Sequence, residues 1–235
     1  MTFGKFKFTL IELIITITIF LVLIALLLPA LSVVKLKANR TKCNSNIRQY
    51  VMTQILYAKD NDGYLINGER RPLGLNDSML RWPLESYDFM VEEYGISDLL
   101  CRNGHAGGVL DYNVVYGPQT GYMYFGNHGD LQKMLPDYQL PKKITHTFNS
   151  VLFSDAITRS TTWKFTWVPH VRSKHRVNDG GLIPLKEISR VEGGNFGFLD
   201  GSVQWVDVKH LEEFRVIENT VINETIFGLF PPAGF

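Results

Sequence analysis

Residues 8–34 read FTLIELIITITIFLVLIALLLPALSVV, and this stretch decides the fold of the N-terminal part of the chain. From Leu13 to Val34 it carries no charged residue over 22 positions. A helix of this length would be about 33 Å long, at about 1.5 Å per residue, and a hydrocarbon core is about 30 Å thick. The sequence therefore predicts a membrane-spanning helix near the N-terminus.

The apolar run differs from a cleaved secretory signal, which is shorter and ends in small residues at a cleavage site. Here the run continues through residues 26–31 into a charged, helix-like segment, so we expect the anchor to stay. Glu12 lies at the start of the span, where a carboxylate is costly unless it sits at the interface, is protonated or meets a cation. A partner for Glu12 is expected. A plain anchor with an incidental Glu12 is the less favoured interpretation.

A basic leader with Lys5 and Lys7, followed by Phe8-Thr9-Leu10-Ile11-Glu12, resembles the class III signal of type IV prepilins and type II secretion pseudopilins. The resemblance implies that a prepilin peptidase cuts between Lys7 and Phe8 and methylates the new amine of Phe8. It also implies that Glu12 attracts the amine of a neighbouring subunit during assembly. The chain departs from the family at Lys7, where Gly is usual, and Gly4 lies too early for the glutamate spacing.

Lysine and arginine on both sides of the span leave its orientation open by charge alone. The resemblance implies a single-pass protein of the bacterial inner membrane, with the bulk of the chain periplasmic or extracytoplasmic. It also implies that the protein resides in a pilus or pseudopilus when assembled.

A helical stripe continues beyond Pro29, with apolar residues at three-to-four-residue spacing. Its members are Leu36, Cys43, Ile47, Val51, Ile55 and Ala58. Asp60-Asn61-Asp62-Gly63 then supplies a turn signal that ends the helix. We therefore divide the chain into a leader (1–7), a transmembrane helix (8–34), the soluble half of the long helix (35–60) and a globular domain (61–235).

The remaining residues predict short helices and strands rather than repeats. A helix is expected from Glu85 to Tyr94 and a short one near His210 to Glu213. Strands are expected at Tyr122–Phe125, Val151–Asp155, Thr162–Val168, Asn195–Leu199 and Ser202–Val206. The fold class predicted is α+β and pilin-like, with an antiparallel sheet packed on the soluble half of the long helix, and the apolar tail 227–235 is expected to pack back on the domain.

Asp200-Gly201 joins the last two predicted strands and is a strong hairpin signal, since both turn positions are expected to need positive φ. The hairpin sequence is similar to the end of pilin-like proteins from planctomycetes and related bacteria. These proteins pair a prepilin N-terminus with a His, nine residues, then Asp-Gly. The corresponding position here is Arg190, so the histidine is absent, although His175 precedes a segment that resembles the usual lead-in.

Two cysteines, Cys43 and Cys101, are too few and too far apart in sequence for a zinc site or a redox CxxC motif. In an oxidising compartment they could form a disulfide, or they could be two buried thiols, and the spacing leaves both open. Asp179 is the candidate for a Ca2+ site, because major pseudopilins hold Ca2+ in a C-terminal loop. It lacks the dense acidic spacing of a dedicated site, so a structural turn is favoured and no cofactor is expected.

The charge balance excludes one class of function. With 24 Lys and Arg against 23 Asp and Glu, the chain has no basic footprint for nucleic acid. No nucleophile elbow, P-loop, dinucleotide fingerprint or His-Glu-x-x-His is present, so no catalysis is expected. Asp155, Asp179, Asp200, His170 and His175 could converge in space, but turns collect such residues for ordinary reasons.

The sequence thus favours a structural subunit of a type II secretion or type IV pilus-like assembly. Its partners would be prepilin peptidase, the membrane, and other pilin or pseudopilin subunits that contact its N-terminal helix. The alternative is a membrane-tethered extracytoplasmic binding module that does not polymerise.

Overall fold

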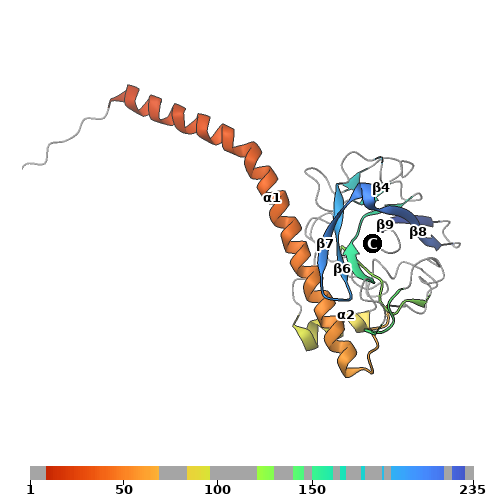
Figure 1. Cartoon of the computed structure of the whole chain (residues 1–235). Helices are drawn as coiled ribbons and strands as arrows, with labels where there is room; N and C mark the ends of the chain where they lie inside the picture. Colours follow the sequence, from red (N-terminus) through yellow and green to blue (C-terminus); the bar gives the residue numbers. More distant parts are fainter. Residues whose placement is uncertain are drawn as a thin grey trace, which may run out of the picture. The chain divides into compact units, whose positions relative to one another are not determined.

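The computed structural model of the chain describes residues 9–68, 84–95, 121–129, 140–145, 150–160, 165–167, 176–177, 187, 192–219 and 224–230 (Figure 1). The chain divides into two compact units, Met1–Ala38 and Asn39–Phe235. The long apolar helix and the antiparallel strands confirm the predicted α+β class.

Helix α1 runs from Leu10 to Asp60 and continues through Pro29, as predicted. It ends where the sequence signals a turn. Asp62 and Gly63 both take positive φ, 50° and 79°, and the Gly63 amide donates a hydrogen bond of 2.7 Å to the Ala58 carbonyl. A glycine beyond the last turn adopts this conformation at little cost, which is why the helix stops here.

Helix α2 spans Leu84–Tyr94 and confirms the predicted helix. It packs against the C-terminal end of α1. Met90 is fully buried, and its sulfur lies 3.4 Å from Nε2 of Gln54 on α1. The rings of Phe89 and Tyr57 meet edge to face with centroids 5.5 Å apart.

A four-stranded antiparallel sheet contains β1 (Tyr122–Tyr124), β2 (Val151–Asp155), β6 (Gly193–Phe198) and β7 (Val203–Asp207), in the order β1-β2-β6-β7. Figure 1 shows β6 and β7 alongside the part of α1 that follows Asn39. The predicted β6–β7 hairpin is confirmed, but its connection differs from the expectation. Only Gly201 of the Asp200-Gly201 pair takes positive φ, at 87°, because the loop spans four residues and the Phe198 amide bonds the Ser202 carbonyl.

A second, five-stranded antiparallel sheet was not predicted from the sequence. It has the order β5-β4-β3-β9-β8 and contains β3 (Thr158–Ser160), β4 (Phe165–Trp167), β5 (Arg176–Val177), β8 (Glu212–Asn219) and β9 (Glu224–Phe230). Within the strand expected at Thr162–Val168, Phe165–Trp167 forms β4, and the other residues of that expectation lie outside the described ones. Part of the apolar tail is β9, which pairs with β3 and β8.

The helix expected at His210–Glu213 is wrong. A 3-10 turn, η2, occupies Val208–His210 instead, and Glu212 already begins β8. The Asp207 carboxylate accepts a hydrogen bond from the Lys209 amide at 3.1 Å. This cap starts the turn directly after β7, so the chain turns earlier than the apolar pattern indicated.

The hydrophobic core of the second unit lies between α1 and the four-stranded sheet. Tyr50 of α1 stacks on Phe153 of β2 with ring centroids 5.2 Å apart, and both rings are buried. At Gly197 of β6 an added Cβ would lie within 2.9 Å of Val51 Cγ2 and would also clash with Ile47. Glycine therefore lets the strand approach the helix closely, and this contact fixes the helix on the sheet.

Candidate functional site

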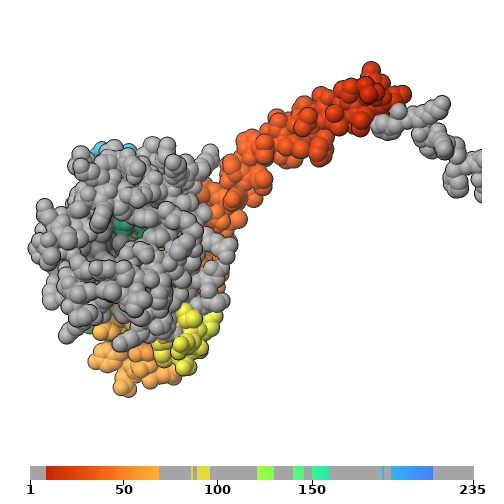
Figure 2. Space-filling model, turned by 180° about the vertical axis from the view of Figure 1, so that it is seen from behind, coloured from red at the N-terminus to blue at the C-terminus, as the bar shows by residue number. Residues whose placement is uncertain are grey.

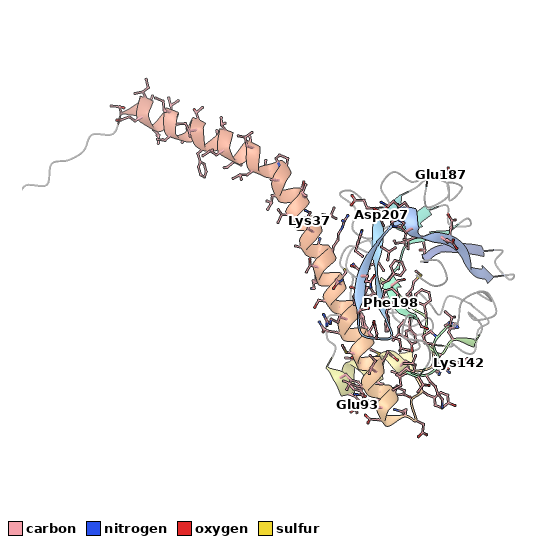
Figure 3. All side chains as sticks on the ribbon, viewed as in Figure 1. Lys37, Glu93, Lys142, Glu187, Phe198 and Asp207 are labelled. Atoms are coloured by element: carbon pink, nitrogen blue, oxygen red, sulfur yellow. The ribbon has the colours of Figure 1, made fainter. Side chains whose placement is uncertain are left out.

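The first half of α1 exposes apolar side chains around its whole circumference (Figure 3). From Thr9 to Val34 every residue is exposed except the half-exposed Val33, and Leu10 reaches 77%. Within the described part of the chain, α1 is the helix long and apolar enough to cross a membrane. So much exposed apolar surface is unfavourable in water and is compatible with a single-pass membrane protein.

Glu12 lies in the first turn of this helix and contacts Thr9. Glu12 Oε2 accepts hydrogen bonds from the Thr9 amide at 2.9 Å and from the Thr9 hydroxyl at 2.7 Å. The Glu12 amide in turn donates to Thr9 Oγ1 at 3.3 Å. These reciprocal bonds are a capping box, in which Thr9 is the N-cap and Glu12 satisfies a backbone donor that the helix leaves open.

The capping box leaves part of the carboxylate uninvolved. Both bonds from Thr9 go to Oε2, so Glu12 Oε1 takes part in neither of them. A carboxylate offers about four lone-pair positions, enough to cap its own helix and accept a further donor. The box therefore holds Glu12 at the helix start in a fixed orientation.

Thr9 was not among the partners predicted for Glu12. The signal was present, because Thr9-Leu10-Ile11-Glu12 has the Ser/Thr-x-x-Glu spacing of a capping box just before an apolar run. Lys7 and Phe8, which flank the predicted cut, lie outside the described residues. Their processing stays a prediction.

Asp155, one of the acidic residues that could have converged with histidines, is engaged in a structural contact. Its Oδ2 accepts hydrogen bonds from the backbone amide and the side-chain amide of Asn195 at 2.7 and 2.8 Å. Asn195 Oδ1 accepts from Asn44 Nδ2 of α1 at 3.5 Å. Asp155 and Asn195 are both buried, so their contact links β2, β6 and α1 inside the domain.

Arg40 adds a second polar contact between α1 and the hairpin. Its guanidinium forms an ion pair with Glu192 and lies 4.2 Å from the ring centroid of Trp205 on β7. The Arg40 carbonyl also accepts a bond from Asn195 Nδ2 at 3.5 Å. A cation over an aromatic face is favourable, so these contacts hold the β6–β7 hairpin on the helix.

Asp200 of the hairpin motif has a local role in the described structure. Its side chain accepts a hydrogen bond from the Ser202 amide at 2.8 Å, which is the pattern of an Asx turn. The carboxylate is exposed and shapes the connection between β6 and β7. Gly201 supplies the positive φ that the same turn requires.

The remaining candidate residues are only partly placed. Cys43 is buried in the core, while Cys101 lies outside the described residues, so a disulfide between them stays a prediction. Asp179, His175 and Arg190 also lie outside the described ranges. Among the residues that are described, no three His, Cys, Asp or Glu side chains gather as metal ligands would.

A buried tyrosine lies at the centre of the helix–sheet contact. The Tyr124 hydroxyl donates to the Ile66 carbonyl at 2.7 Å and lies 3.0 Å from Gln54 Oε1, and both side chains are buried. Burial raises the pKa of Tyr124 well above 10.0, with a smaller contribution from Tyr57. The hydroxyl therefore keeps its proton, and Tyr124 fastens the loop at Ile66 to α1.

Comparison of the chain with protein-family models, with curated proteins and with solved structures finds no match. The N-terminal motif and the geometry of α1 are therefore the features that bear on function. These define a protein with an apolar N-terminal helix suited to a membrane and an α+β unit after Asn39.

Proposed function

We propose that the chain is a prepilin-like subunit of a type II secretion or type IV pilus-like assembly. In this proposal a prepilin peptidase removes residues 1–7, and residues 8–34 pack with copies of the chain or with sister pilins. The observation that carries the proposal is the exposed apolar half of α1 with Glu12 fixed in its first turn by Thr9. The Thr9 cap would suit a plain anchor as well, so the order Phe8-Thr9-Leu10-Ile11-Glu12 after a basic leader is what favours a prepilin over a plain anchor.

Glu12 is costly at the start of a membrane-spanning helix. A carboxylate at the edge of hydrocarbon loses hydration, and a cation from a neighbouring subunit offsets that loss. The new amine of Phe8 would be such a cation. Because the Thr9 bonds occupy only Oε2, Oε1 is the oxygen that would accept from a neighbour's amine. One charged pair in an apolar interface also favours a single axial register between subunits.

The positions of the Phe8 amine and the Glu12 carboxylate decide how two subunits would associate. An amine at one subunit's N-terminus and a carboxylate within another subunit's helix are different surfaces, so the contact is head to tail. Such heterologous contacts generate a filament when the rotation does not close. The unit from Asn39 onward would then give the assembly its specificity.

Two differently tagged copies of the full chain, expressed together and extracted from membranes, test this proposal. Glu12→Ala should leave the membrane-bound amount unchanged and abolish co-purification of the two tags. Thr9→Ala is the matched control, because it removes the side-chain cap but keeps the carboxylate, and it should retain most of the co-purification. Wild-type copies that never co-purify would favour the tethered binding module instead.

A further inference from the structure

Two exposed lysines, Lys35 and Lys37, are the first cations of α1 beyond the apolar span. The helix carries no acidic residue between Glu12 and Asp60. Figure 2 shows the first part of α1, in red and orange, with its side chains at the surface, and Figure 3 labels Lys37. Neither lysine belongs to the prepilin-like motif, so the proposed function assigns them no role.

The two lysines follow the span at the depth of the lipid head groups. The uncharged run ends at Val34. At a rise of about 1.5 Å per residue, Lys35 lies about 1.5 Å and Lys37 about 4.5 Å beyond it along the helix. The head-group region adds about 5–8 Å to each side of a hydrocarbon core of about 30 Å. With α1 across a bilayer, both lysines are therefore within the head-group region.

The two side chains leave the helix on different sides. Successive residues of an α-helix turn by about 100°, so Lys35 and Lys37 are about 200° apart around the axis. They therefore suit two lipids rather than one. The aliphatic stem of a lysine stays near the acyl chains while its ammonium reaches the phosphate. Lys37 also takes part in an interaction within the chain, and the three N–H donors of its ammonium leave room for a lipid phosphate.

Charge distinguishes between classes of lipid. The next cation of α1, Arg40, is engaged by Glu192 and by the ring of Trp205, so it is not counted in the site. Lys35 and Lys37 are nearer the end of the span and have no acidic neighbour on α1 to offset their charge. A zwitterionic lipid carries its own cation beside the phosphate, whereas phosphatidylglycerol does not. Anionic lipids are therefore favoured at this position.

We propose that Lys35 and Lys37 bind the phosphates of anionic phospholipids, so that the chain gathers such lipids around the end of its span. A lysine near an anionic membrane surface strengthens association by roughly fivefold. This lipid contact goes beyond the proposed function, because it requires the membrane span but neither cleavage by a peptidase nor assembly into a filament.

Electron spin resonance of spin-labelled lipids tests this contact. The full-length chain is placed in phosphatidylcholine bilayers that contain a trace of spin-labelled phosphatidylglycerol or spin-labelled phosphatidylcholine. We expect the wild type to restrict the motion of phosphatidylglycerol in preference, by roughly twofold or more. Lys35→Gln should lower this preference, and Lys35→Gln combined with Lys37→Gln should lower it further. The decrease is the readout, because Lys5 and Lys7 can attract the same lipids at the other end of the span.

Lys59→Gln is the matched control for Lys35→Gln. Lys59 is exposed on the same helix and follows Val34 by 25 positions. This places it about 38 Å further along α1, well beyond a Debye length of about 8 Å. The same loss of charge should therefore leave the lipid preference unchanged. Co-sedimentation with the vesicles checks that each variant is inserted.

Three outcomes would overturn the assignment of Lys35 and Lys37 to lipid. The first is an unchanged lipid preference in the inserted double variant, and the second is an equal decrease for Lys35→Gln and Lys59→Gln. The third is a double variant in which two tagged copies no longer co-purify while the lipid preference is unchanged, which would assign the two lysines to a protein partner instead.

Discussion

Asp155 Oδ2 accepts two hydrogen bonds from Asn195, at 2.7 Å from the backbone amide and at 2.8 Å from the side-chain amide. Asp155 ends β2 and Asn195 lies on β6, the two paired central strands of the four-stranded sheet, and both side chains are buried. Asn195 also receives a bond from Asn44 of α1 and donates one to the Arg40 carbonyl. One asparagine therefore connects two strands and the helix in the interior of the domain.

Asn195→Ala removes the side-chain bonds and leaves the buried Asp155 carboxylate with one donor fewer from this residue. An unsatisfied buried polar group costs about 1–3 kcal/mol, and more when it is charged, so we expect the free energy of unfolding to fall by at least that amount. Urea unfolding of the chain in detergent micelles measures it. Gln204→Ala on β7, at an exposed position, is the control and should change stability by about 0.5 kcal/mol or less. Equal effects of the two substitutions would contradict this role of Asn195.

Gly197→Ala tests the close approach of β6 to α1. The added methyl group would overlap Ile47 and Val51, so we expect a loss of about 1–3 kcal/mol in the free energy of unfolding. Ile47→Ala removes one of the two obstructing groups at the cost of a cavity. The double variant should therefore be destabilised by less than the sum of the two single variants, and simple additivity would show that Gly197 does not contact Ile47.

The raised pKa of Tyr124 predicts that the stability of the folded chain responds to alkaline pH. Its pKa is raised in the folded state, so the folded chain keeps the phenol proton while the unfolded chain begins to lose it near pH 10.0. The stability that Tyr124 contributes is fully present below the unfolded pKa and is lost as pH rises toward the folded pKa. The difference in unfolding free energy between the wild type and Tyr124→Phe should be constant near neutral pH and should decrease above about pH 10.5. A difference that stays constant to higher pH would contradict the buried, protonated hydroxyl.

The parts of the fold that the sequence predicted depend on local signals. The long helix, α2, β2 and the β6–β7 hairpin each carry their own periodicity, turn or end signal, such as Asp60-Asn61-Asp62-Gly63 after α1. The second sheet carries no comparable signal, because β3 pairs with β9, and Thr158 faces Gly228 across a long sequence separation. Such pairing is decided by packing of the whole domain rather than by residues near each strand.

The candidate site residues likewise divide into those with a local sequence signal and those that only the fold brings together. Glu12 was identified because an acid in an apolar helix is conspicuous, whereas its partner Thr9 was overlooked although the Thr-x-x-Glu spacing was visible. The contacts of Asn195 with Asp155 and Arg40 could not be predicted, since β6, β2 and α1 carry these residues and only the fold brings them together. The two turn-forming residues, Asp200 and Gly201, were found because turns are local.

The most direct test of the central claim is the intact mass of the protein recovered from membranes, combined with N-terminal sequencing. Recognition by a prepilin peptidase requires a chain that begins at Phe8 and carries one methyl group on its new amine, and this is the result we expect. A chain that keeps Met1 and residues 1–7, in cells with an active prepilin peptidase, would contradict the assignment as a prepilin-like subunit.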